Sequence, residues 1–186
     1  MVKIPEIETS RTLITVLTPD DADLICRYYC DNKEHLAPFE PERHAEFYTV
    51  EALKGRLIKS YSAFKCGVSV CFAALSHDRK EMMAGCNFTG IVRGPFNACY
   101  LGYSVAKKHE GQGLMFEVAS ASIKYMFEEE KIHRIMANHM PDNDRSAKLL
   151  KRLGFDREGY AREYLKINGK WRDHILNALV NPDPEI

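Results

Sequence analysis

Neither sign of charge dominates this chain of 186 residues, and no long apolar run occurs in it. Lys plus Arg and Asp plus Glu both number 26, so the formal net charge is zero. Because phosphate neutralisation dominates nucleic-acid affinity, a neutral chain is a poor candidate for a dedicated nucleic-acid binder. No apolar stretch approaches the roughly 20 residues that cross a bilayer, and the start, "MVKIPEIETSRTL", lacks the apolar centre of a signal peptide. We expect a cytoplasmic protein with no membrane partner and no direct nucleic-acid partner.

Metal-binding spacings are missing as well. The six cysteines are scattered without a CxxC pair, and the seven histidines form no HExxH or similar set of ligands. Because we expect no export signal, we also expect the cysteines to be reduced thiols. The sequence therefore predicts no metal site.

One domain spanning residues 1–186 is expected, because no repeat, low-complexity tract or linker divides the chain. Patterns typical of strands occur at 11–18, 68–75, 82–92, 97–106, 133–140, 157–167 and 170–180. Helical patterns occur at 18–32, 49–64 and 114–128, and again after residue 142, where Gly154 ends the last helix. The fold class is therefore α/β (α+β), with a mixed central sheet of about seven strands, flanking helices and one βαβ-like crossover at 97–140.

Two glycines stand in "KKHEGQGLMFEV" (107–118), between a predicted strand and a predicted helix. A glycine turn at a helix N-terminus is a physical anion site, because the first N–H groups of the helix are free and glycine admits a close approach. The stretch lacks both the Gly-Lys-Ser/Thr of a P-loop and the third glycine of a dinucleotide fingerprint, which argues against ATP and NAD. Taken alone, the glycines fit a tight turn without a ligand equally well.

Two motifs in this chain resemble those of the GNAT superfamily of acyl-CoA transferases. Lys108-x-x-Gly111-x-Gly113 is similar to the Arg/Gln-x-x-Gly-x-Gly/Ala turn, with Lys in place of the usual first residue. Further on, "NDRSAKLLKRLGF" is similar to a second signature, which it matches at Asn143, Ser146, Leu149, Gly154 and Phe155. The resemblance extends over residues 8–181. It implies the GNAT fold, with a sheet splayed at the coenzyme site, and acetyl-CoA as the cosubstrate.

The same resemblance implies how the coenzyme is bound. In that superfamily the glycine turn cradles the coenzyme A pyrophosphate, largely through its main chain, which points to Lys108, Gly111, Gln112 and Gly113. The strands at 97–106 and 133–139 resemble the pair that separates around the pantetheine arm. Backbone groups near Ser104 and Val105 would bind that arm like an added strand, and an N–H there would polarise the thioester carbonyl.

Asn143 and Ser146 are three residues apart, so we expect them to share a helix face and to approach the sulfur together. Spacing alone favours a simpler interpretation, in which both residues only cap a short helix. The resemblance favours Asn143 as a coenzyme contact and Ser146 as the acid that protonates the departing thiolate.

The general base is expected to be a carboxylate. An N-terminal α-amine has a pKa of about 8, so a modest base suffices. Glu163, in the predicted closing hairpin, is the best candidate by position, because related N-terminal transferases place a Glu there. Glu158 and Glu40 are the alternatives. Glu163 is also consistent with an ordinary exposed strand carboxylate.

A narrower resemblance concerns the acceptor. The stretches "HLAPFEP", "KHEGQGLMFEV" and "LKINGKWRDHILNAL" look like those of ribosomal-protein alanine N-acetyltransferases, above all the type that acts on ribosomal protein S5. It implies the N-terminus of S5 as the partner. The segment 33–49 is expected to be a loop, and its part 35–48 would either line a peptide groove or merely connect two elements. Acetylation of a small amine and a GNAT-like module that binds the assembling ribosome remain alternatives.

Overall fold

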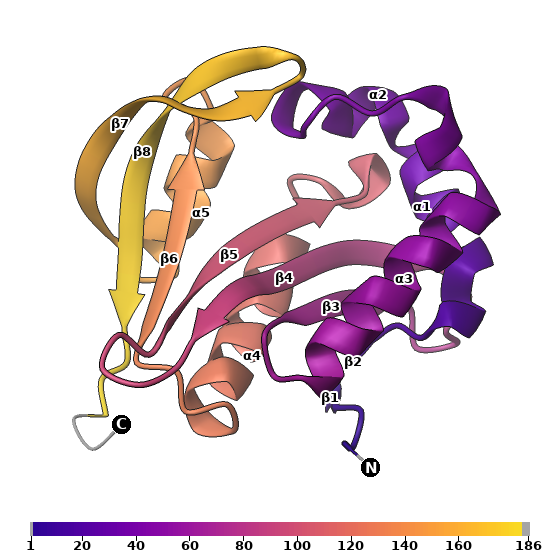
Figure 1. Cartoon of the computed structure of the whole chain (residues 1–186), viewed down its shortest axis with the longest axis horizontal. Coiled ribbons are helices and arrows are strands. Elements are labelled where there is room, and N and C mark those ends of the chain that lie inside the picture. Colours follow the sequence, from indigo (N-terminus) through magenta and orange to yellow (C-terminus); the bar gives the residue numbers. More distant parts are fainter. Residues whose placement is uncertain (1, 184–186) are drawn as a thin grey trace.

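The computed structural model describes residues 2–183 and contains one mixed sheet of eight strands (Figure 1). In chain order these are β1 (Glu6–Glu8), β2 (Leu13–Val16), β3 (Val70–Leu75), β4 (Met82–Val92), β5 (Ala98–Val105), β6 (Arg134–His139), β7 (Asp156–Ile167) and β8 (Lys170–Val180). The additional strand is β1. Its sequence, Glu-Ile-Glu, is too short and polar to show a strand pattern, and antiparallel pairing with β2 defines it.

The strands follow the order β1-β2-β3-β4-β5-β6-β8-β7. Neighbours are antiparallel except for β5 and β6, which are parallel. The parallel pair arises because helix α4 (Leu114–Glu128) carries the chain across the sheet between the two strands, which confirms the predicted crossover. The closing hairpin turns at Asn168 and Gly169, both with positive φ, as a two-residue turn requires.

Helices cover both faces of the sheet. Besides α4 they are α1 (Ala22–Asp31), α2 (Lys33–Leu36), α3 (Val50–Lys65) and α5 (Asp144–Arg152). Alternate residues of β3 enter different cores, because successive side chains of a strand point to opposite faces. Phe72 and Ala74 pack in the cluster that contains α4 and α5, whereas Ala73 and Leu75 pack with α1 and α3. Thus α1 and α3 lie on one face and α4 on the other (Figure 1).

The segment 33–49 is not the plain loop that the sequence predicts. It contains α2 and two turns of 3₁₀ helix, Ala37–Phe39 and Ala45–Tyr48. Contacts with other elements hold it in place. The Phe47 ring lies 5.0 Å from the Tyr29 ring, centroid to centroid. The Arg56 guanidinium lies over the Phe47 ring, 4.9 Å from its centroid, in a cation–π contact. These contacts join residues far apart in the sequence, so the local pattern does not reveal them.

Candidate active site

β5 and β6 part at one end of their pairing. Their register extends from Ala98–Arg134 to Tyr100–Met136, although both strands continue past that point. The other edge of β5 stays paired with β4 as far as Val105. The last part of β5 therefore has one edge open, and such an edge has the free backbone groups that an added strand or an extended ligand needs. This separation is the splay that the sequence resemblance implies.

The glycine turn connects the open end of β5 to α4. Gly111 and Gly113 have φ of 74° and 75°, the left-handed region that favours glycine. An added Cβ at either glycine would meet no atom within 4 Å, so the space before the turn is open. α4 begins at Leu114, and the N–H groups of its first turn have no acceptor within the helix. The free donors and the positive end of the helix dipole suit a phosphate.

Arg11 holds this turn from the segment that precedes β2. Its Nη1 donates to the Gln112 carbonyl oxygen over 2.9 Å, and its Nε donates to a Glu117 carboxylate oxygen over 2.7 Å. The Ser10 hydroxyl donates to Glu117 over 2.9 Å. Although burial raises the pKa of the Glu117 carboxyl, hydrogen bonds from Thr9, Arg11 and Ser10 lower it to about 2. The charged Glu117 thus fixes the first turns of α4 to the start of the sheet.

Lys108 and Gln112 direct their side chains at protein groups. The Lys108 Nζ lies 2.8 Å from a Glu81 carboxylate oxygen, and the Gln112 Nε2 donates to the Lys108 carbonyl oxygen over 2.8 Å. Both side chains thereby stabilise the turn. With these side chains engaged, the main chain of the turn is the part that remains able to contact an anion.

Ser104 and Val105 end the open edge of β5, and α1 braces them from one face. The Tyr28 and Ser104 hydroxyl oxygens are 2.8 Å apart. Just past the strand, the Lys107 amide donates to the Asn32 Oδ1 over 2.7 Å. The exit of β5 is therefore fixed before the glycine turn begins.

Ser146 lies in the first turn of α5 and is buried. Asn143 is the N-cap of this helix, and its Oδ1 accepts a hydrogen bond from the Ser146 amide over 3.1 Å. The prediction of a shared helix face is therefore wrong, because Asn143 lies just before the helix as its N-cap. In this position its side chain accepts a hydrogen bond from an amide of the first turn, which has no acceptor within the helix. Asn143 and Ser146 still lie together at the start of α5.

A third residue, Tyr103, lies beside Ser146, and sequence patterns do not indicate it. The Tyr103 hydroxyl oxygen, from β5, lies 2.5 Å from the Ser146 Oγ. In residues 2–183 it is the one hydrogen-bond partner of that hydroxyl. Tyr103 looks like an ordinary strand aromatic in the sequence, and 43 residues separate the two. The resemblance to known motifs therefore points to Ser146 as a candidate but gives no sign of its hydrogen-bond partner, Tyr103.

Glu163 lies on the edge strand β7, at the irregular register between Ala161 and Leu165. Its φ is 47°, and its amide donates to the Asp173 Oδ1 over 2.8 Å, while its side chain is exposed. In the sheet order β8 and β6 lie between β7 and β5. The end of the β7–β8 hairpin arches toward α2, however, and so over the end where β5 and β6 part (Figure 1).

The two alternative carboxylates differ in position. Glu158 forms an ion pair with Arg134, at the start of β6, and so lies at the far end of that strand from the splay. Glu40 lies near the hairpin turn, where its carbonyl oxygen accepts a hydrogen bond from the Asn168 amide over 2.9 Å. Burial raises the pKa of the Glu40 carboxyl, while Arg43, whose Nε lies 3.7 Å from it, acts in the opposite sense.

Segment 33–49 and the hairpin turn form one wall. An added Cβ at Gly169 would lie 3.0 Å from a Glu42 carboxylate oxygen, so the two segments are in close contact. A pocket of about 250 Å³ lies at their junction, and its lining includes Tyr29, Glu40 and Asn168. Its polar and aromatic lining gives this wall a concave surface.

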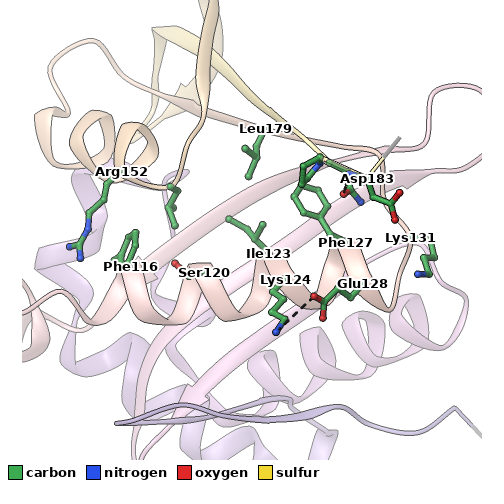
Figure 2. Close-up of a pocket in the computed structure, with 13 residues that line it drawn as sticks. Phe116, Ser120, Ile123, Lys124, Phe127, Glu128, Lys131, Arg152, Leu179 and Asp183 are labelled. Carbon is green, nitrogen blue, oxygen red and sulfur yellow. Dashed lines mark hydrogen bonds and ion pairs between the residues drawn. The ribbon is translucent and has the colours of Figure 1, made fainter. Parts of the chain in front are cut away.

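A larger groove, of about 570 Å³, runs along α4 (Figure 2). Phe116, Ser120, Ile123 and Phe127 line it from the helix, and the Arg152 guanidinium stacks 3.7 Å from the Phe116 ring centroid. None of the residues that the sequence predicts for the site lines this groove. It is separate from the splay and the glycine turn.

Residues 2–183 contain neither a membrane-spanning helix nor a cluster of metal-ligating side chains. No helix in this range has the length and apolarity needed to cross a membrane. The same residues contain no group of three or more His, Cys, Asp or Glu side chains arranged to hold a metal ion.

An open strand edge leads directly into a main-chain anion site, beside a buried serine hydroxyl. That arrangement suits a long, extended thioester with a pyrophosphate at one end, and the glycines leave the space such a group needs. It is the arrangement of an acyl-CoA-dependent transferase. The chain belongs to this class: residues 11–156 match the family described as acetyltransferase (GNAT) domain. The protein is an acetyl-CoA-dependent N-acetyltransferase.

Within this family, the chain is similar to several individual proteins. It is 45% identical over 175 residues to the ribosomal protein uS5-alanine N-acetyltransferase of Escherichia coli (strain K12), covering 94% of this chain and 90% of that protein. The crystal structure of a ribosomal-protein-S5-alanine acetyltransferase from Vibrio fischeri is 36% identical and superposes with a TM-score of 0.92 over 96% of this chain and 98% of that one.

Mycobacterium smegmatis RimJ, solved in complex with CoA-disulfide, has a TM-score of 0.86 and covers 95% of this chain and 86% of that one. At 22% identity the likeness shows a common fold.

Proposed function

We propose that this protein, as one domain of residues 1–186, acetylates the N-terminal alanine amine of ribosomal protein uS5 (S5) in the cytoplasm. The observation that carries the proposal is the 45% identity, over 94% of the chain, to the Escherichia coli enzyme whose name states that activity. The 36% identity to the Vibrio fischeri protein supports the same acceptor.

The coenzyme lies along the open edge of β5 and ends at the glycine turn. Main-chain groups from Lys108 through Gly113 hold the pyrophosphate, and Gly111 and Gly113 give it room. The pantetheine arm adds to β5 at Ser104 and Val105, where a backbone N–H polarises the thioester carbonyl. Asn143 uses its Oδ1 as the cap of α5, which leaves its Nδ2 to contact the coenzyme.

The amine attacks the thioester directly. Its nitrogen forms a bond with the carbonyl carbon, and the bond from that carbon to sulfur then breaks. The Ser146 hydroxyl gives its proton to the departing sulfur and recovers one from water. The Glu163 carboxylate takes the proton that the attacking amine loses. No covalent bond to the enzyme forms, and Glu40 is the alternative base.

The acceptor is an α-amine rather than a lysine side chain. An N-terminal ammonium has a pKa of about 8 and a lysine about 10.4, so far more of the former is free amine at neutral pH. The wall made by segment 33–49 and the hairpin turn lies where an extended peptide end would approach. A small first residue such as Ala fits beside the thioester, where a bulky one clashes.

Mass spectrometry of a peptide panel with acetyl-CoA tests this proposal. The panel contains the S5 N-terminal peptide beginning with Ala, the same peptide beginning with Leu, a lysine peptide with a blocked N-terminus, and a free polyamine. We expect the Ala peptide to react at least tenfold faster than the others, because a tenfold preference needs only about 1.4 kcal/mol. Its rate should rise from pH 6 to 8.

Equal or faster turnover of the lysine peptide or the polyamine would overturn the acceptor and favour the small-amine alternative. Coenzyme A binding without turnover of any of these amines would favour a binding module.

A further inference from the structure

Tyr103 and Ser146 meet between β5 and α5. Their hydroxyl oxygens are 2.5 Å apart, at the short end of the range for O–H···O hydrogen bonds. Tyr103 directly precedes Ser104 on the strand whose edge the splay opens. The pair thus joins the start of α5 to the strand that the coenzyme would extend.

The direction of this hydrogen bond decides where the Ser146 proton points. A serine hydroxyl has one proton and two lone pairs, so it either donates to Tyr103 or accepts from it. Burial raises the pKa of Tyr103 to about 12, although the hydrogen bond with Ser146 lowers it. The phenol therefore keeps its proton throughout the neutral range and is always able to donate.

We propose that Tyr103 is a positioning residue, which donates its hydroxyl proton to the Ser146 Oγ and leaves the Ser146 proton directed at the departing sulfur of the thioester. This inference rests on the proposed role of Ser146 as the acid. The O–H bond of Tyr103 stays intact throughout: sulfur takes the Ser146 proton as its bond to carbon breaks, and water returns a proton to Ser146.

The hydrogen bond has two physical effects. A serine in a helix otherwise tends to turn its hydroxyl toward the carbonyl four residues earlier, and acceptance from Tyr103 holds the Ser146 hydroxyl in one rotamer. As the proton leaves Ser146, negative charge develops on the Oγ, and a donor already in place stabilises that charge. Ser146 is only 9% exposed, so little water competes for the Oγ.

Single-turnover acetyl transfer tests the role in Tyr103→Phe, Ser146→Ala and the double variant, with saturating acetyl-CoA. Ser146→Ala should slow transfer about 100-fold, the typical contribution of a general acid. Tyr103→Phe should slow it about tenfold, as the loss of one hydrogen bond to a charged group would. The double variant should match Ser146→Ala, because Tyr103 acts only through the serine.

Two further measurements separate this role from a general structural one. Coenzyme A affinity, by calorimetry, should stay within about threefold of wild type in Tyr103→Phe, which corresponds to less than one hydrogen bond. In thermal unfolding of the ligand-free variants, the double variant should lose less stability than the sum of the two single losses, because both single substitutions break the same hydrogen bond. Tyr125→Phe is the matched control: it removes the phenolic hydroxyl of half-buried Tyr125 on α4, whose ring packs edge-on against Phe72, and should leave transfer unchanged.

If the two losses were independent, the double variant would be about 1000-fold slower than wild type, and this would overturn the role of Tyr103. A wild-type rate in Tyr103→Phe would overturn it too. A wild-type rate in Ser146→Ala would overturn the acid as well. Neither outcome bears on the acceptor, because the same thiolate departs whichever amine attacks. The peptide panel decides the acceptor, and the ratios of variant to wild-type rates decide Tyr103.

Discussion

The proposed coenzyme side and the proposed acceptor side of this site are built in different ways. The glycine turn is tied to three other parts of the fold: Arg11 bonds to Gln112, Glu81 pairs with Lys108, and Arg145 pairs with Glu110. On the acceptor side, a single backbone hydrogen bond, from Asn168 to Glu40, joins segment 33–49 to the hairpin turn among the described residues.

This difference matches what each side must recognise. The coenzyme is the same in every turnover, and a main-chain anion site fixed by many ties presents an unchanging set of donors. In the proposed function the acceptor contacts side chains on surface segments, and such segments vary without disturbing the sheet. Coenzyme A affinity should therefore be little affected by substitutions that change only side chains and strongly reduced by those that disturb the backbone. On the acceptor side, single side-chain substitutions should have the larger effect.

The largest effect is expected on the acceptor side, from Glu163→Gln. Loss of the base should lower kcat about 100-fold at pH 7 while coenzyme A affinity stays unchanged. The loss should shrink by pH 9, where an α-amine with a pKa of about 8 is mostly free. Glu158→Gln is the matched control, since Glu158 is an exposed carboxylate on the same strand and lies away from the splay. An equal loss at pH 7 and pH 9 would contradict the role as base.

On the coenzyme side, Gly113→Val should lower coenzyme A affinity at least tenfold, because a side chain would occupy the place of a phosphate oxygen and strain a left-handed backbone. Gly94→Val is the matched control: Gly94 has φ of 77° and an equally open surrounding, but lies in the turn between β4 and β5. It should lose similar stability and keep its affinity, as calorimetry and thermal unfolding can measure. Equal loss of affinity in both variants would contradict a phosphate contact at Gly113.

The coenzyme side is also the part that the sequence predicts best. A turn with glycines at fixed spacing between a strand and a helix has a local physical cause, and Gly111 and Gly113 adopt the left-handed conformation that such a turn requires. The crossover and the closing hairpin are predicted for the same reason, since periodicity and the Asn168-Gly169 turn are local signals.

The parts that sequence reasoning misses depend on contacts between distant residues. Segment 33–49 is helical in part because Phe47 packs against Tyr29 and Arg56. A motif makes Ser146 a candidate, but its hydrogen bond to Tyr103 exists only after β5 and α5 come together. No periodicity or spacing encodes such a pair.

A smaller effect is expected from Glu117→Gln, which weakens the tie to Arg11. Coenzyme A affinity should fall about fivefold, or roughly 1 kcal/mol, through a less fixed turn. The free energy of unfolding should also change its pH dependence. The pKa of Glu117, about 2 in the folded protein, lies below the ordinary value of about 4.3. Its carboxylate therefore stabilises the fold above that value, and this contribution is lost as the pH falls toward 2.

Denaturant unfolding at pH 7 and pH 3 measures that pH effect. Wild type should be more stable than Glu117→Gln at pH 7, and the difference should be smaller at pH 3. A difference that does not change with pH would show that packing of Glu117, rather than its charge, holds the turn.

The smallest effect is expected at Lys108, although its position opens the glycine motif. Its Nζ is paired with Glu81 and its carbonyl oxygen with Gln112, so the phosphate should meet the main chain rather than the ammonium group. Lys108→Gln should therefore change coenzyme A affinity less than about twofold, since an exposed ion pair contributes little. Calorimetry at low and high salt measures this. A tenfold loss that grows at low salt would mean that Lys108 leaves Glu81 to bind phosphate, and that a side chain shares in the anion site after all.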